Sequence, residues 1–156
     1  MAAALFTPTG LAATTVAVDD GEVVGFVQSG AEAGLTLRVA LGILRIFGRR
    51  TPGFVRRDRS RAKVHISPPT GAFHISELHV LASRRNQGLG AALLAETERE
   101  ARGRGFTQMS LTTTLSNPAR RLYERYGFAT AATREDPEYR AITGMDGRVL
   151  MVKDLA

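Results

Sequence analysis

The sequence contains no cysteine. This absence excludes disulfide bonds, cysteine-ligated zinc and thiol nucleophiles together. The sequence also lacks any run of about 20 apolar residues, the length that a membrane-spanning helix needs. Its N-terminus has neither the basic start nor the apolar stretch of a signal peptide. We therefore expect a cytoplasmic protein that does not span a membrane.

The composition is typical of one folded globular domain. Of 156 residues, 44% are hydrophobic and 23% are charged, so the chain can bury a core and its length predicts a single domain over residues 1–156. The net charge of +6 comes from residues 38–63, which hold nine Lys or Arg and one acid, Asp58. The rest of the chain therefore carries a net −2, and the basic character belongs to one segment.

Hydrophobic periodicity and turn residues divide the chain into strands and helices. Two β-rich runs separated by Asp-Asp-Gly predict a β-hairpin over residues 14–28. We expect further strands at 72–81, 106–114, 128–133 and 149–153, and helices at 35–47, at 89–102 and from Asn117 onward. We expect residues 48–63 to be irregular. Strands that alternate with helices predict an α/β layer structure with a partly parallel sheet.

A glycine-rich turn with the sequence VLASRRNQGLGA joins a strand to a helix at residues 80–91. Gly88 and Gly90 let the backbone approach a ligand closely, and the first helical turn offers free N–H groups to an anion. Arg84 and Arg85 add positive charge. The turn lacks the Gly-Lys-Ser/Thr of a P-loop and the third glycine of a dinucleotide fingerprint. It predicts phosphate or pyrophosphate binding, with a tight turn carrying exposed arginines as the alternative.

A second motif, NPARRLYERYGF, occupies residues 117–128. Val80-x4-Arg85-x2-Gly88-x-Gly90 and Asn117-x5-Tyr123 followed by Gly127-Phe128 resemble the two signatures of the GNAT superfamily of acetyl-CoA-dependent N-acetyltransferases. The resemblance covers residues 14–30 and 72–155. It implies a mixed, mostly antiparallel sheet, with a central parallel pair splayed for acetyl-CoA and helices on its flanks.

The resemblance also implies which residues bind acetyl-CoA. The strand end would align the pantetheine arm, with the Val80 N–H near the thioester carbonyl. Asn117 matches a position that contacts pantetheine, and a plain helix N-cap is the alternative. Backbone amides of the following turn would hold the pyrophosphate. The complete set is Leu78, Val80, Leu81, Arg85, Asn86, Gln87, Gly88, Leu89, Gly90, Ala91, Asn117 and Tyr123.

Two side chains take catalytic roles by the same resemblance. Tyr123 matches the general acid that protonates the departing CoA thiolate, and a core tyrosine is the alternative. Glu77 matches the position where members of the family often carry the base. A carboxylate inside a buried strand tends to have a raised pKa, which suits this role. A structural pair with an arginine is the alternative. His79 is the reserve base and shares the face of Glu77, with His74 and Ser76 on the other face.

The remaining histidines, His65 and His74, have no supporting context, and no metal site is expected. The mechanism implied is direct attack of a primary amine, from a small molecule or a protein, on the thioester. Because no acyl-enzyme is needed, the lack of cysteine agrees with it.

The sequence departs from the family at its N-terminal part, where the usual strand and helices appear shortened, and at residues 31–69. This basic, partly helical insertion would cover the acceptor side or form a subunit contact, which is consistent with a homodimer. Two alternatives to the enzyme stay open. One is a non-catalytic acetyl-CoA-binding module, and the other is a basic nucleic-acid-binding protein, which the scarcity of aromatic residues among the arginines does not favour.

Overall fold

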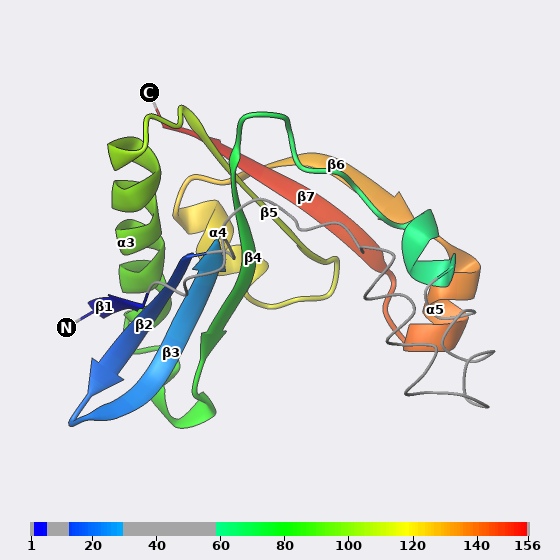
Figure 1. Ribbon diagram of the computed structural model, residues 1–156. Helices are drawn as coiled ribbons and strands as arrows, with labels where there is room; N and C mark the ends of the chain where they lie inside the picture. The colour runs from blue at the N-terminus through cyan, green and yellow to red at the C-terminus, as the bar shows by residue number, and fades with distance from the viewer. Residues whose placement is uncertain (1, 6–12, 30–58, 156) are drawn as a thin grey trace, which may run out of the picture.

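The computed structural model describes residues 2–5, 13–29 and 59–155. Within these residues, strands form one mixed seven-stranded sheet in the order β1-β2-β3-β4-β5-β7-β6 (Figure 1). Neighbouring strands are antiparallel except for the central pair, β4 and β5, which are parallel. The predicted α/β fold with a mostly antiparallel sheet and a central parallel pair is therefore confirmed.

The strands are β1 (Ala2–Leu5), β2 (Ala13–Asp19), β3 (Glu22–Ser29), β4 (Phe73–Val80), β5 (Gln108–Thr114), β6 (Ala129–Glu135) and β7 (Gly147–Asp154). The helices are the 3-10 turn η2 (Ala82–Arg84), α3 (Leu89–Gly103), α4 (Arg120–Arg125) and α5 (Pro137–Thr143). The predicted hairpin is β2 and β3, and the predicted helix over 89–102 is α3. The expected helix over 35–47 lies outside the described residues.

Three elements were not predicted from the sequence. One is β1, so a strand is present near the N-terminus and only residues 6–12 separate it from β2. Another is the helical turn at residues 59–63, where irregular structure was expected. The third is α5, whose signals were in the sequence: Asp136 accepts a hydrogen bond from the Tyr139 N–H at 2.8 Å, and Pro137 occupies the first helical turn. Both are standard helix-start features.

The helix α3 covers one face of the sheet, where it packs against β2, β3, β4 and β5. Its apolar stripe is fully buried at Leu93 and Leu94, because residues spaced three to four apart share one side of a helix. Met109 of β5 and Met151 of β7 face the same side and are also buried. We call this side the α3 face, and it holds the main apolar core.

A β-bulge interrupts β4 next to its middle. Gln28 of β3 lies opposite Glu77, whereas the next residue, Ser29, lies opposite Ile75. Ser76 is therefore the extra residue, and a bulge of this kind bends and twists its strand.

The bulge also shifts which β4 side chains face the core. Phe73 and Ile75 belong to the core before the bulge, and Leu78 and Val80 pack against it afterwards. Glu77 and His79 consequently lie on the face opposite α3, together with His74. The prediction that His74 and Ser76 lie on the other face from Glu77 and His79 is wrong, because strict alternation does not hold across a bulge.

The parallel pair β4 and β5 separates along its length. Its paired residues are Phe73 with Met109, His74 with Ser110, and Ile75 with Leu111. After Leu111, β5 continues beside β7, while the rest of β4 continues beside β3. The two strands thus diverge from the level of Ser76 and Thr112 onward, which is the predicted splay, and Figure 1 shows them moving apart.

Residues 59–66 and α5 lie near each other, beside the end of β6 and the start of β7 (Figure 1). Val64 and Tyr139 are buried there, at 1% and 2% exposure. Lys63 forms an ion pair with Glu138 of α5 at 2.6 Å. Among the described residues, no helix combines the length and apolar character needed to cross a bilayer.

Candidate active site

The turn between β4 and α3 has a backbone shape suited to an anion. Asn86 and Gly88 both adopt positive φ angles, 61° and 82°. Such left-handed residues among ordinary ones form concave arrangements of N–H groups that bind anions. A positive φ is costly for a residue other than glycine, and strain of this kind gathers at functional sites. The side chains from Arg85 to Gly88 are exposed, so a ligand can reach the backbone here.

The first turn of α3 adds further donors to the same place. The first intrahelical hydrogen bond runs from the Ala92 N–H to the Gly88 carbonyl at 3.0 Å. The amides of Leu89, Gly90 and Ala91 therefore precede the helical ladder and point out of the helix end. Gly88 is the N-cap and contributes no side-chain acceptor. Together with the helix dipole, these amides can hold a pyrophosphate.

The two arginines of the turn have different partners. Arg84 forms an ion pair with Asp19 of the β2–β3 hairpin at 3.0 Å. Arg85 donates from Nε to the Val80 carbonyl at 3.3 Å. The turn is thereby tied to the hairpin on one side and to the end of β4 on the other.

The end of β4 directs polar backbone groups into the gap of the sheet. The Leu81 N–H donates to the Val24 carbonyl of β3 at 2.9 Å. Because backbone groups of successive strand residues alternate in direction, the amides of Leu78 and Val80 point away from β3, toward the gap left by β5. An extended chain placed in this gap can form strand-like hydrogen bonds with them.

The helix α4 packs directly against the anion-binding turn. A Cβ added to Gly90 would lie 2.8 Å from Leu122 Cδ2, so the absence of a side chain at Gly90 lets the two helices meet. Tyr123 follows Leu122 and is buried in the core cluster with Phe128, at 6% exposure. Burial raises the pKa of the Tyr123 phenol, which keeps it protonated and able to donate at neutral pH.

Asn117 organises the start of α4. Its Oδ1 accepts from the Ala119 N–H at 2.9 Å, and its Nδ2 donates to Thr113 Oγ1 at 2.6 Å. Asn117 therefore stabilises the turn before α4 and is not the N-cap of the helix, because the regular helix begins at Arg120 and its N-cap is Ala119. The amide nitrogen carries a second proton that can meet a ligand.

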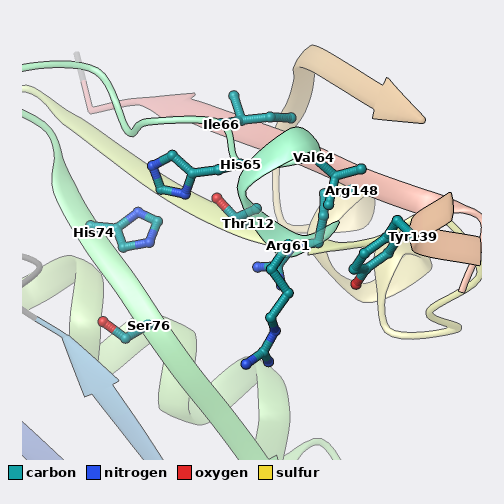
Figure 2. Close-up of a pocket in the computed structure, with 9 residues that line it drawn as sticks. All are labelled: Arg61, Val64, His65, Ile66, His74, Ser76, Thr112, Tyr139 and Arg148. Atoms are coloured by element: carbon teal, nitrogen blue, oxygen red, sulfur yellow. The ribbon is translucent and has the colours of Figure 1, made fainter. Parts of the chain in front are cut away.

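A cavity of about 270 Å³ lies on the face opposite α3 (Figure 2). Its lining comes from five parts of the chain: the segment 61–66, the strands β4, β5 and β7, and the helix α5. The residues are Arg61, Val64, His65, Ile66, His74, Ser76, Thr112, Tyr139 and Arg148. His74 Nδ1 lies 3.0 Å from Ser110 Oγ, within hydrogen-bond distance.

The family model described as Acetyltransferase (GNAT) family matches residues 3–128. The chain belongs to the GNAT acetyltransferase family. The family and the fold support acetyl transfer as the activity of this chain. No curated protein sequence matches this chain.

Solved GNAT structures share the fold of this GNAT protein. The ribosomal-protein-S18-alanine N-acetyltransferase of Escherichia coli aligns with a TM-score of 0.59 and 19% identity, covering 92% of this chain and 68% of that chain. A GNAT acetyltransferase from Elizabethkingia anophelis with acetyl-CoA bound gives 0.61 and 14%, covering 92% and 76%. The IAA acetyltransferase of Bacillus cereus gives 0.61 and 15%, covering 92% and 78%.

The two base candidates of this GNAT protein form a pair. His79 Nε2 lies 2.8 Å from Glu77 Oε2, and the His79 ring stacks on Phe26 with centroids 5.2 Å apart. The side chain of Glu77 is 54% exposed, so the burial on which its assignment rested is absent. β4 is buried only over its first three residues. Glu77 therefore keeps its candidacy through the partnership with His79, not through desolvation.

Sequence reasoning missed most of the cavity. His65 and His74 had no visible context, yet both line it with Arg61 and Arg148. No spacing rule relates these four residues, since they meet only through the packing of 61–66 and β7 around β4. No group of three His, Asp or Glu side chains suited to a metal ion occurs among the described residues.

Proposed function

We propose that this protein is an N-acetyltransferase that moves the acetyl group of acetyl-CoA to a primary amine by direct attack. The proposal rests mainly on the anion-binding turn, which directly follows the end of β4, and two neighbouring features support it. The turn spans residues 85–91, and the supporting features are the gap beside Leu78 and Val80 and the buried Tyr123 on a helix packed against Gly90. A diphosphate, a pantetheine arm and a thioester follow each other in that order in acetyl-CoA.

The reaction then needs no covalent acyl-enzyme. The neutral amine attacks the thioester carbonyl carbon, and the Val80 N–H stabilises the oxyanion. When the intermediate collapses, the C–S bond breaks and the CoA sulfur takes the proton of the Tyr123 hydroxyl. After the attack, the nitrogen loses a proton to the Glu77–His79 pair, directly or through water, and a proton returns to the Tyr123 oxygen through solvent. The hydrogen bond within the pair lets Glu77 orient the imidazole.

Turnover with a panel of amines tests this proposal. Purified protein is mixed with acetyl-CoA and each amine, and free thiol is measured. We expect thiol release with at least one amine and a rate at least tenfold lower for Tyr123→Phe. Tyr126→Phe is the matched control, because Tyr126 packs beside Phe128 and Lys153 outside the predicted acid position.

Two results would contradict the proposal in different ways. Thermal stabilisation by acetyl-CoA without transfer to any amine would identify a non-catalytic acetyl-CoA-binding module. No detectable affinity of the folded protein for CoA or acetyl-CoA would remove the donor assignment as well. The cytoplasmic location, the homodimer and the role of the basic segment 38–63 stay predictions.

A further inference from the structure

Two arginines and two histidines line the cavity on the face opposite α3. Arg61, Arg148, His65 and His74 contribute to its wall, and the other lining residues are apolar or hydroxyl-bearing. Among the described residues, no carboxylate lines it. A concave site with one sign of charge concentrates ligands of the opposite sign.

Neither cavity arginine forms an ion pair within the described part of the chain. No carboxylate there lies within 4.0 Å of Arg61 or Arg148. By contrast, Arg102 and Arg104 on α3 each pair with a glutamate one turn away. Guanidinium groups bind carboxylate and phosphate through two parallel hydrogen bonds, so these two arginines keep that capacity.

Arg148 also faces a like charge. In the β6–β7 ladder it lies directly opposite Arg134, and like charges at directly opposed positions destabilise a sheet. A bound anion would offset this repulsion. The cross-strand pair is thus a further observation on Arg148 that is consistent with a negatively charged ligand.

The cavity opens where the sheet splits. Ser76 and Thr112, which line it, immediately follow Ile75 and Leu111, the last paired residues of β4 and β5. In Figure 2 the Arg61 side chain extends along β4 in the direction from His74 toward Ser76. A ligand in the cavity therefore reaches the start of the gap from the face that carries Glu77 and His79.

We infer that this cavity binds the acceptor and that the acceptor is a small amine bearing an anionic group, a carboxylate or a phosphate. Arg61 and Arg148 bind the anion, and the amine points along β4 toward the gap. The volume of about 270 Å³ suits a small molecule. This inference rests on the proposed function for the transfer step, but the anion site itself can be tested without turnover.

Histidine NMR spectroscopy tests the anion site directly. The chain has three histidines; His65 and His74 line the cavity, whereas His79 pairs with Glu77 outside it. Inorganic phosphate and acetate, titrated separately at constant pH and ionic strength, should shift the ring signals of His65 and His74 saturably and leave His79 unchanged. The two titrations distinguish a phosphate site from a carboxylate site.

Charge removal sharpens the same experiment. Arg61→Gln and Arg148→Gln should each weaken the binding of the anion at least tenfold. Arg99→Gln, an equal charge change on the outer side of α3, should leave it unchanged. Shifts that do not saturate, that include His79 equally, or that persist in the Arg61→Gln, Arg148→Gln double variant would overturn the inference.

Matched acceptors separate this inference from the proposed function. Phosphoethanolamine is compared with ethanolamine, and alanylglycine with its C-terminal amide. We expect kcat/KM at least tenfold higher for the anionic member of one pair, and a KM increase for it in Arg148→Gln. Equal transfer to both members of each pair would overturn the inference and leave the proposed function standing. Saturable histidine shifts without any transfer would overturn the proposed function and support the anion site.

Discussion

Glu98 on the α3 face and the two cavity arginines on the opposite face differ in whether a partner of opposite charge lies beside them. On the α3 face, Glu98 is largely covered and accepts hydrogen bonds from Lys153 and Arg102, beside a closely packed apolar core. On the other face, Arg61 and Arg148 border a cavity and have no carboxylate partner within the described residues. The comparison indicates that the α3 face is arranged for stability and the cavity face for a ligand, since unpaired charge around a cavity does not stabilise the folded state.

The largest expected effect lies in the core of the α3 face. Leu93→Ala should lower the free energy of unfolding by about 3 kcal/mol, because it removes buried methyl groups and leaves a void. Urea denaturation followed by circular dichroism measures it. Val23→Ala on the exposed hairpin, where the side chain is 54% exposed, should cost less than about 1 kcal/mol. Similar losses for both would contradict the stability role of the α3 face.

A smaller effect is expected at the turn that joins this face to the proposed donor site. Gly88→Ala should cost about 1–2 kcal/mol, because Gly88 has a φ of 82° with nothing near a new Cβ, so the cost is backbone strain alone. The distorted turn should also bind acetyl-CoA more weakly, as calorimetry would show. Gly103→Ala at the end of α3 has open space and no positive φ, and it should be neutral or slightly stabilising. Unchanged acetyl-CoA affinity in Gly88→Ala would argue against the turn as the pyrophosphate site.

The smallest expected effect is a pH-dependent change in stability at Glu98, a paired charge on the α3 face. Desolvation pushes the pKa of Glu98 upward, but hydrogen bonds from Lys153, Arg102 and Tyr126 outweigh it and hold this pKa below its ordinary value of 4.5. The folded state therefore favours the charged carboxylate. Its contribution to stability is complete above pH 4.5 and is lost as the pH falls through the lower pKa of the folded protein.

Lys153→Met should accordingly cost about 1 kcal/mol at pH 7 and less at pH 3. Denaturation curves at the two pH values give both numbers. Arg148→Gln, the corresponding change on the cavity face, should alter stability by less than about 0.5 kcal/mol without ligand, since it removes repulsion from Arg134 and breaks no ion pair with any of the described residues. A large loss in Arg148→Gln would show that its charge stabilises the fold, and the distinction between the faces would fail.

Local sequence patterns predicted the elements of the α3 face well. The stripe of apolar residues in α3 and the glycines that follow it specify a helix of nearly the observed length. The β2–β3 hairpin follows from one turn signal between two β-rich runs. The start of α5 carries a local signal of the same kind, because Asp136 and Pro137 are ordinary helix-start residues.

The β4 strand shows the limit of such patterns. Its alternation was interpreted as continuous, but the bulge at Ser76 offsets the second half of the strand by one residue. Glu77 is expected to be buried if the whole strand is buried, but β4 is buried only over its first three residues, and Glu77 is 54% exposed beside His79. A bulge leaves little mark in one strand's sequence because it depends on how two strands pair.

The sequence by itself determined the family, the order of most elements and the anion-binding turn, because each depends on contiguous residues whose conformational preferences act over a few positions. Only the tertiary structure decided the bulge, the Glu77–His79 pair and the basic cavity. Arg61, His74 and Arg148 come from distant parts of the chain, and their meeting depends on long-range packing that no spacing within the sequence encodes.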